Sequence, residues 1–287
     1  MLLRRHLLVL CLSGCAAAPS EPQALRRAIS ADGVGIVYRI QGQGSTAVVL
    51  VHGWACNASY WREQVAALAE RYTVVTLDLA GHGGSGAERS DWSITRFGDD
   101  IAAVVRELPQ QKVVLVGHSM GGPAVVAAAA KLALTQRVVG LIGVDTLKNI
   151  GLPPPPASVR QTMVGAFEQD FAGTMRKNVI ERMFRPTSNV QLVQRVADGM
   201  ARMPAQRGLA MLGGLFKPEW EAHLPALKVP LVAINSDLGG RTDDQHIRNT
   251  APTFRSITLP GAGHFVMLEE PQRFNAVLLQ QLSLLAP

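Results

Sequence analysis

Two alternating patterns of hydrophobic and polar positions run along most of this chain. Short runs rich in β-branched and aliphatic residues, such as residues 46–51 (TAVVLV), are apolar at every position, as expected of strands covered on both faces. The longer stretches between them carry apolar residues at helical spacing, as in residues 95–108. The pattern predicts strands over 34–40, 46–51, 72–77, 112–116, 138–144, 229–234 and 255–259, and helices over 61–72, 95–108 and 123–134.

Strands that alternate with helices favour one fold class. Each strand must cross over a helix to reach the next parallel strand, and such crossovers are nearly always right-handed. We therefore predict an α/β fold with a mostly parallel central sheet and helices on both faces, formed by residues 29–145 and 227–287.

The alternation stops between residues 146 and 226, where a run of four prolines (153–156) is followed by no β-rich segment. Apolar residues recur there at every fourth position. A step of four residues drifts by about 40° on a helix of 3.6 residues per turn, so one straight helix cannot keep them all on one face. We expect two short helices broken near Gly173, within a helical insertion that caps one end of the sheet. The recurring residues are Met163, Phe167, Phe171, Met175, Val179 and Met183.

The first 28 residues are typical of an export signal followed by a tether. Arg4 and Arg5 precede a short apolar run, and small residues follow it, as in a secretory signal peptide. Residues 12–15 (LSGC) resemble the bacterial lipobox, which predicts a signal peptide over 1–14, lipidation of Cys15 and a tether over 15–28. The alanines at 16–18 offer an ordinary cleavage site as the alternative. We expect export to the cell envelope, with membrane contact through a lipid anchor at most.

Composition and charge exclude several other classes of protein. Hydrophobic residues make up 47% of the chain and charged residues 17%, which is enough apolar material for a large core. The net charge of +6 is scattered rather than gathered in a basic stripe, so nucleic-acid binding is not expected. Three cysteines give neither a disulfide framework nor zinc-ligand spacing. We find no metal or phosphate-loop motif, and we expect no cofactor and no metal.

Residues 117–121 (GHSMG) fit the G-x-S-x-G pattern at the point where an apolar run meets a helical stretch. A sharp strand-to-helix turn holds the serine in a strained backbone conformation, and glycines on either side let the chain pack closely. The amino terminus of the following helix also presents free N–H groups near the serine oxygen. Ser119 is therefore the candidate nucleophile.

Further polar segments follow the other predicted strands, and together they carry a family resemblance. They are residues 51–54 (VHGW), residues 78–85 (DLAGHGGS) and residues 261–265 (GAGHF). With the GHSMG segment, the chain resembles the α/β-hydrolase superfamily, in its capped esterase and lipase form. The resemblance covers residues 33–145 and 227–287 well, whereas the insertion matches only in position and helical character.

This resemblance implies roles for named residues. Ser119 would be the nucleophile, His264 the general base, and the backbone N–H groups of Trp54 and Met120 the oxyanion hole. His52 and His82 would hold their loops, and His118 would be a packed neighbour of the serine. The cap would contribute an acyl pocket near Met163, Phe167 and Phe171.

Three aspartates compete for the place of the acid that orients the histidine. Asp237 is favoured, because it comes first after the 229–234 strand, where the family usually places its acid. The sequence departs here from the G-x-x-D-like loop of the family. Asp243 is better suited to cap the next helix, and Asp145 ends the 138–144 strand, where some relatives carry the acid.

The reaction that these residues favour is cleavage of a small-molecule carboxylic ester through an acyl-enzyme on Ser119. Two alternatives remain open. One is a carbon–carbon bond hydrolase of the same fold, since the G-x-S-M-G-G segment occurs there too. The other is a ligand-binding relative without turnover, because a fold alone does not establish an activity.

Overall fold

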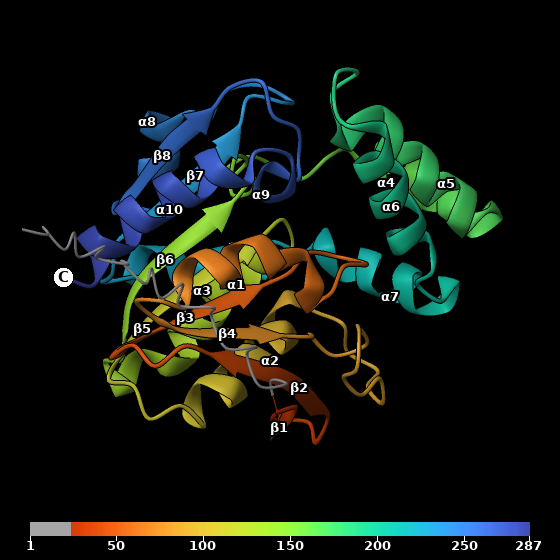
Figure 1. The fold of residues 1–287 in the computed structure, drawn as a ribbon. Coiled ribbons are helices and arrows are strands. Elements are labelled where there is room, and N and C mark those ends of the chain that lie inside the picture. The colour runs from red at the N-terminus through yellow and green to blue at the C-terminus, as the bar shows by residue number, and fades with distance from the viewer. Residues whose placement is uncertain (1–23) are drawn as a thin grey trace, which may run out of the picture.

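A single eight-stranded sheet runs through the computed structural model, which describes residues 24–287 (Figure 1). The strand order is β1-β2-β4-β3-β5-β6-β7-β8; β1 and β2 run antiparallel to their neighbours, and all other neighbours pair in parallel. The predicted α/β fold is confirmed. The strands are β1 (Arg26–Ile29), β2 (Gly35–Gln41), β3 (Thr46–Val51), β4 (Thr73–Leu77), β5 (Lys112–His118), β6 (Val138–Val144), β7 (Leu231–Ser236) and β8 (Phe254–Leu259).

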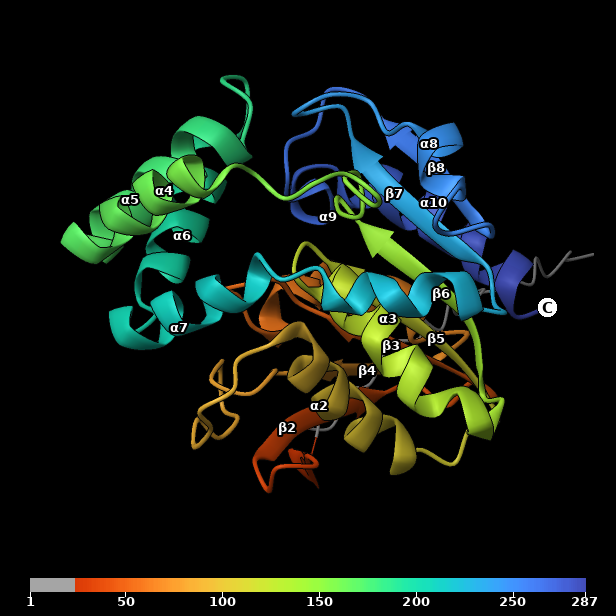
Figure 2. The ribbon, with the colours of Figure 1, turned by 180° about the vertical axis from the view of Figure 1, so that it is seen from behind.

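Helices cover both faces of this sheet, as the two opposite views in Figures 1 and 2 show. One face carries α1 (Arg62–Leu68), which begins after the short turn η1 (Ala58–Trp61), and α10 (Pro271–Leu285). The other carries α2 (Ile94–Arg106) and α3 (Gly121–Leu132). Because both faces are covered, every residue of β3 is buried, which explains its unbroken apolar sequence. The remaining core elements are η2 (Ala133–Thr135), η4 (Glu219–Ala226), α8 (Asp244–Arg248) and α9 (Val266–Glu269).

Four helices between β6 and β7 form a separate group, which we call the cap (Figure 1). They are α4 (Ala157–Gln169), α5 (Phe171–Asn178), which runs into the wider turn η3 (Val179–Met183), α6 (Val190–Ala201) and α7 (Ala205–Leu215). The predicted break between two short helices lies at Asp170 rather than near Gly173. Asp170 has an extended backbone, and its side chain accepts a hydrogen bond from the Gly173 N–H at 2.9 Å, so it caps α5.

The predicted tether extends too far into the fold. Arg26–Ile29 forms β1 and pairs with β2, so residues 26–28 belong to the sheet. The predicted signal peptide and Cys15 lie outside the described residues. None of the described helices has the length and apolar character needed to cross a membrane.

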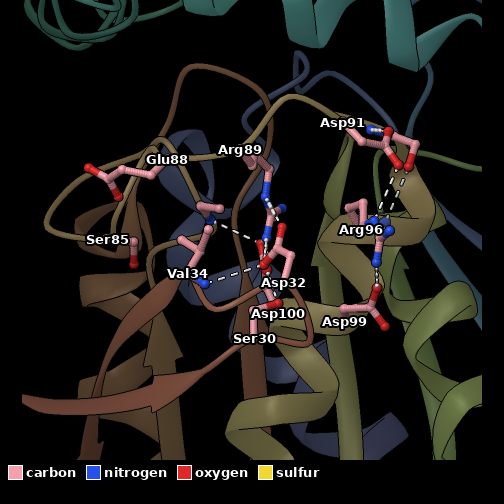
Figure 3. Close-up of polar contacts among 12 residues, drawn as sticks. Ser30, Asp32, Val34, Ser85, Glu88, Arg89, Asp91, Arg96, Asp99 and Asp100 are labelled. Carbon is pink, nitrogen blue, oxygen red and sulfur yellow. Dashed lines mark hydrogen bonds and ion pairs between the residues drawn. The ribbon is translucent and has the colours of Figure 1, made fainter.

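A buried ion network fixes the loop between β4 and α2 (Figure 3). The Arg89 side chain is 1% exposed and donates to Asp100 at 2.6 Å, while its Nε lies 2.9 Å from Asp32. Ser30 and the Ala80 N–H also donate to the Asp100 carboxylate, at 2.7 and 3.0 Å. Because burial makes an unpaired charge costly, these contacts hold the loop firmly against the sheet.

Candidate active site

Ser119 stands on a sharp turn between β5 and α3. Its φ angle is +51°, a left-handed conformation that L-residues seldom adopt. A Cβ added to Gly117 would lie 2.2 Å from the Gly121 carbonyl oxygen, so a side chain would not fit where the turn closes on itself. The Ser119 N–H donates to the Val144 carbonyl at 3.0 Å, and this bond ties the turn to the end of β6.

The loop after β3 lies directly against this turn. A Cβ on Gly53 would come within 3.0 Å of the Ser119 Cβ, and one on Gly121 would come within 2.7 Å of the Val51 carbonyl oxygen. The backbone N–H groups of Trp54 and Met120 have no hydrogen-bond partner among residues 24–287. One of these donors follows Gly53 and the other follows Ser119, so both belong to the two segments that meet at this turn; their role as an oxyanion hole stays a prediction.

Asp145, at the end of β6, is the carboxylate that contacts His264. Its Oδ2 lies 2.7 Å from the His264 Nδ1. The N–H and hydroxyl of Ser236 donate to Oδ1 at 2.9 and 2.8 Å, and the Lys148 ammonium lies 2.9 Å from the same oxygen. Burial opposes the ionisation of Asp145, but the contacts with His264 and Lys148 outweigh it and lower its pKa to about 2.

His264 follows β8 on a loop that both the core and the cap hold in place. Its backbone N–H donates to the Met183 carbonyl at 2.7 Å, and the neighbouring Gly263 N–H donates to Glu269 at 2.9 Å. The imidazole is 20% exposed, so a substrate can reach it. The Ser119 hydroxyl forms no hydrogen bond within the described part of the chain, neither with the His264 imidazole nor with another group.

The prediction that Asp237 is the acid beside His264 is wrong in this structure. The Asp237 carboxylate accepts from the Arg185 guanidinium and from the Gly261 N–H, the latter at 2.9 Å. The Gly261 N–H lowers the pKa of Asp237, and the Arg185 charge adds to this effect. Asp145 instead reaches the imidazole because its own left-handed backbone, with φ of +43°, turns its side chain toward the histidine loop.

The third candidate acid has the structural role that its position suggested. Asp243 precedes α8, and its side chain accepts from the His246 N–H at 3.0 Å, as a helix cap does.

Three other histidines are buried and hold the loops around the site. His52 accepts from the Leu79 N–H at 3.0 Å, and His82 accepts from the Ala55 N–H at 3.2 Å. The Nε2 of His118 lies 2.9 Å from the His264 carbonyl oxygen, and burial followed by the proximity of His264 lowers the pKa of His118 to about 3. All three have the packing roles expected from the sequence.

The predicted pocket residues of the cap meet the loop after β3. Phe167 and Phe171 pack edge-on against the Trp54 indole, with ring centroids 5.4 and 6.0 Å away. Met163 is partly buried on the same helix as Phe167. The Trp54 indole N–H is buried without a hydrogen-bond partner within residues 24–287. Phe167 and Phe171, which we call the aromatic wall, therefore contact the residue that carries one of the free backbone N–H groups, Trp54.

Sequence reasoning missed the residues that hold this arrangement together. Arg185 joins the cap to Asp237 and donates from Nε to the Ala262 carbonyl at 3.1 Å. Lys148 donates to the carbonyls of Ser236 and Leu238 and so links the ends of β6 and β7. Neither residue stands in a recognisable motif, because each depends on loops that are distant in the sequence.

No group of three or more histidine, cysteine or acidic side chains able to hold a metal ion occurs among residues 24–287.

Comparison with known proteins shows which sequences and folds this chain is similar to. The sequence model of the Alpha/beta hydrolase family matches residues 48–277. Among curated proteins, the chain is 26% identical over 260 residues to the pimeloyl-[acyl-carrier protein] methyl ester esterase of Pectobacterium atrosepticum, covering 84% of this chain and 95% of the relative. It is 28% identical over 249 residues to the enzyme of the same name from Aeromonas hydrophila, covering 83% of this chain and 95% of the relative.

Solved structures show the same fold. A thermophilic esterase from Thermogutta terrifontis superposes with a TM-score of 0.79 at 22% identity, covering 92% of this chain and all of the esterase chain. The esterase RhEst1 from a Rhodococcus species superposes with a TM-score of 0.76 at 24% identity, covering 91% of this chain and 99% of that chain.

Proposed function

The chain belongs to the alpha/beta hydrolase family, and from this premise we propose that it is a serine hydrolase that cleaves carboxylic esters. The observation that carries the proposal is the 2.7 Å contact between His264 and Asp145. Both residues are tied to the turn of Ser119, because the Ser119 N–H donates to Val144, next to Asp145, and the His264 carbonyl lies 2.9 Å from the ring of His118. Its curated relatives, whose names describe methyl ester esterases, support an ester as the substrate.

In the proposed reaction, the Ser119 hydroxyl attacks the ester carbonyl while the Nε2 of His264 takes its proton. His264 then delivers that proton to the departing alcohol, which leaves an acyl group on Ser119. Asp145 accepts the Nδ1–H of His264, so the tautomer with a free Nε2 is the one present, and the carboxylate stabilises the imidazolium. A water molecule releases the acid by the same steps.

The negative charge that develops on the carbonyl oxygen needs donors already in position. The unpaired N–H groups of Trp54 and Met120 would supply them, on either side of Ser119. A donor of this kind typically contributes about 3–4 kcal/mol to the transition state. The aromatic wall of Phe167 and Phe171, with Met163, would receive the apolar part of the acyl group.

The test is hydrolysis of a neutral ester, 4-nitrophenyl butyrate, combined with labelling by a fluorophosphonate probe. We expect the purified chain to cleave the ester and to carry the probe on Ser119, identified by mass spectrometry of the labelled peptide. Ser119→Ala should abolish labelling and lower kcat by several orders of magnitude.

Ser283→Ala is the matched control, because Ser283 is exposed on α10 and its hydroxyl donates only to the Gln280 carbonyl. Labelling that persists in Ser119→Ala, or hydrolysis that is unaffected by this change, would show that another group attacks the ester.

A further inference from the structure

A cavity lies between the cap and the loops that follow β3 and β4. Its volume is about 450 Å³, which is in the range of small-molecule sites. The core side is formed by residues 55–57, 59–60 and 81–83, and the cap side by α6 and the start of α7. It holds none of the residues assigned above to the reaction.

Four arginines line this cavity, and no acidic side chain lines it. They are Arg62 on α1, Arg195 on α6, Arg202 at the end of α6, and Arg207 on α7. Two acidic residues stand near these arginines outside the cavity: Glu63 pairs with Arg62 at 3.0 Å, and Asp198 lies close enough to Arg202 for that charge to lower the pKa of Asp198. The cavity itself is therefore positively charged.

Much of the donor capacity of these arginines is unused. Arg207 donates from Nη1 to the Gly81 carbonyl at 3.1 Å, which holds its guanidinium at the wall. The guanidinium groups of Arg195 and Arg202 donate to no protein group within residues 24–287. A guanidinium presents several N–H donors in a planar fork, which matches the oxygens of a carboxylate or a phosphate.

The positive field reaches neutral groups of the same cavity. Burial raises the pKa of the Tyr60 hydroxyl, while the charges of Arg202 and Arg195 oppose that rise. Burial lowers the pKa of His82, and the nearby Arg207 contributes to the lowering. Arg195, Arg202 and Arg207 themselves line the cavity, so a bound ligand would meet their charge.

The cavity adjoins the proposed reaction centre on two sides. Ala55 is two residues beyond Gly53, which touches Ser119, so chain geometry keeps their Cα atoms within about 7.6 Å. Leu268, which also lines the cavity, lies four residues after His264. Both of these stretches of chain are thus short, and an ester that spans them would have its carbonyl at Ser119 and its far end in the cavity.

We infer that this arginine-lined cavity is an anion subsite, and that the preferred esters carry a carboxylate or phosphate group at the end remote from the scissile bond. The inference rests on the proposed function, because it names the substrate class of the same reaction centre. The anion would be held by charge-assisted hydrogen bonds, which are stronger than neutral ones.

Two pairs of esters test the inference, one for each end of the substrate. Monomethyl adipate is compared with dimethyl adipate for an anion on the acyl side, and 1-butyryl-glycerol 3-phosphate with 1-butyrylglycerol for an anion on the alcohol side. The quantity measured is the ratio of kcat/KM for the charged ester to that for its neutral partner. We expect at least one ratio to fall by about tenfold in the double variant Arg195→Gln, Arg202→Gln, equivalent to about 1.4 kcal/mol.

The matched control is the double variant Lys177→Gln, Arg182→Gln. Both residues are exposed on the cap, neither lines the cavity, and the change in net charge is the same. The ratios should stay at their wild-type values in this control. Ratios that do not move in the cavity variant, or that fall equally in both variants, would overturn the inference, because general attraction to a positive protein would then explain them.

Free anions give a further arm of the experiment. Inorganic phosphate or acetate should inhibit hydrolysis of the charged esters competitively, and this inhibition should weaken by about tenfold in the double variant Arg195→Gln, Arg202→Gln. If these salts inhibit the cavity variant as strongly as the wild type, the anions bind elsewhere and the assignment of the subsite is wrong.

Binding separates a failure of this inference from a failure of the proposed function. Calorimetry on Ser119→Ala should show that adipate or glycerol 3-phosphate binds about tenfold more weakly when Arg195 and Arg202 are also replaced. If no ester is cleaved but this difference is present, the anion subsite stands and the proposed function fails. If neutral esters are cleaved through Ser119 and the difference is absent, only the anion subsite fails.

Discussion

At the residue scale, the site depends on backbone conformations that are unfavourable in isolation. Ser119 and Asp145 have φ angles of +51° and +43°, and each such residue typically costs about 1–3 kcal/mol. Hydrogen bonds across the strand ends offset this cost. The Thr146 hydroxyl donates to the Ser119 carbonyl at 2.8 Å, and the Asp145 N–H donates to the Ile234 carbonyl at 3.0 Å. The ends of β5, β6 and β7 therefore fix both residues together.

The same residues show what a sequence can and cannot predict about such a site. Ser119 was predictable, because its glycine neighbours and strand-to-helix setting are local in the chain. The partner of His264 was not, because Asp145 and Asp237 both follow buried strands and differ only in where their side chains turn. That direction depends on the left-handed φ of Asp145 and on Arg185, a cap residue whose guanidinium donates to the Asp237 carboxylate.

At the element scale, one short segment joins the cap to the loop that carries His264. Arg185 contacts Asp237 and the Ala262 carbonyl, while the Met183 carbonyl accepts the His264 N–H at 2.7 Å. The Ser188 hydroxyl donates to Glu269 at 2.6 Å, and the Gly263 N–H donates to the same carboxylate. This anchor, residues 183–188, couples the position of the cap to the position of the imidazole.

We predict that Arg185→Gln and Asp237→Asn each lower kcat on 4-nitrophenyl butyrate, by less than about tenfold, because they loosen the His264 loop without removing a reacting group. The loss in the double variant should be smaller than the sum of the two single losses, because both changes break the contact between Arg185 and Asp237. Hydrogen exchange of residues 260–265 should rise in all three.

Arg248→Gln is the control for this cycle, because Arg248 makes only a 3.7 Å contact with Asp244 on the surface. Effects of Arg185→Gln and Asp237→Asn that simply add would contradict a shared anchor.

At the scale of the whole molecule, the core could be predicted closely, whereas only the position and helical character of the cap could be. The strands of the sheet are continuous apolar runs, so burial on two faces is visible in the sequence; β3 and β6 have the predicted bounds. Helices of the cap bury residues against one another and against the loop of Trp54. Their partners come from distant parts of the chain, so the arginine-lined cavity and the anchor had no local signal.

Burial of neutral histidines makes the stability of the whole molecule depend on pH. Burial is the main cause that lowers the pKa of His52, His82 and His118, the last to about 3. The unfolded chain binds these protons near pH ~6.5, so stability is full above that pH and is lost as the pH falls toward the folded values. Between pH 7 and 5.5 we expect His118, whose folded pKa is about 3, to contribute a loss of about 1 kcal/mol, and His52 and His82 to add losses in the same direction, seen as a lower urea midpoint.

A midpoint that stays constant over this interval would contradict the neutral, buried state of these histidines. Asp100 and Glu269 act in the opposite direction. Burial raises the pKa of both carboxyls, so their protonation favours the folded state as the pH falls further.

The central claim is that Ser119, His264 and Asp145 act together, and the kcat of two asparagine variants on 4-nitrophenyl butyrate tests it most directly. Asp145→Asn keeps the shape but would hold the wrong tautomer of His264, so we predict a loss of about 10³–10⁴ in kcat, with the folded state verified by circular dichroism. Asp237→Asn should lose less than about tenfold, because that carboxylate only anchors loops. A loss of several orders of magnitude in the kcat of Asp237→Asn, together with a nearly wild-type kcat of Asp145→Asn, would contradict the account. The acid that orients His264 would then be Asp237, in the loop after β7.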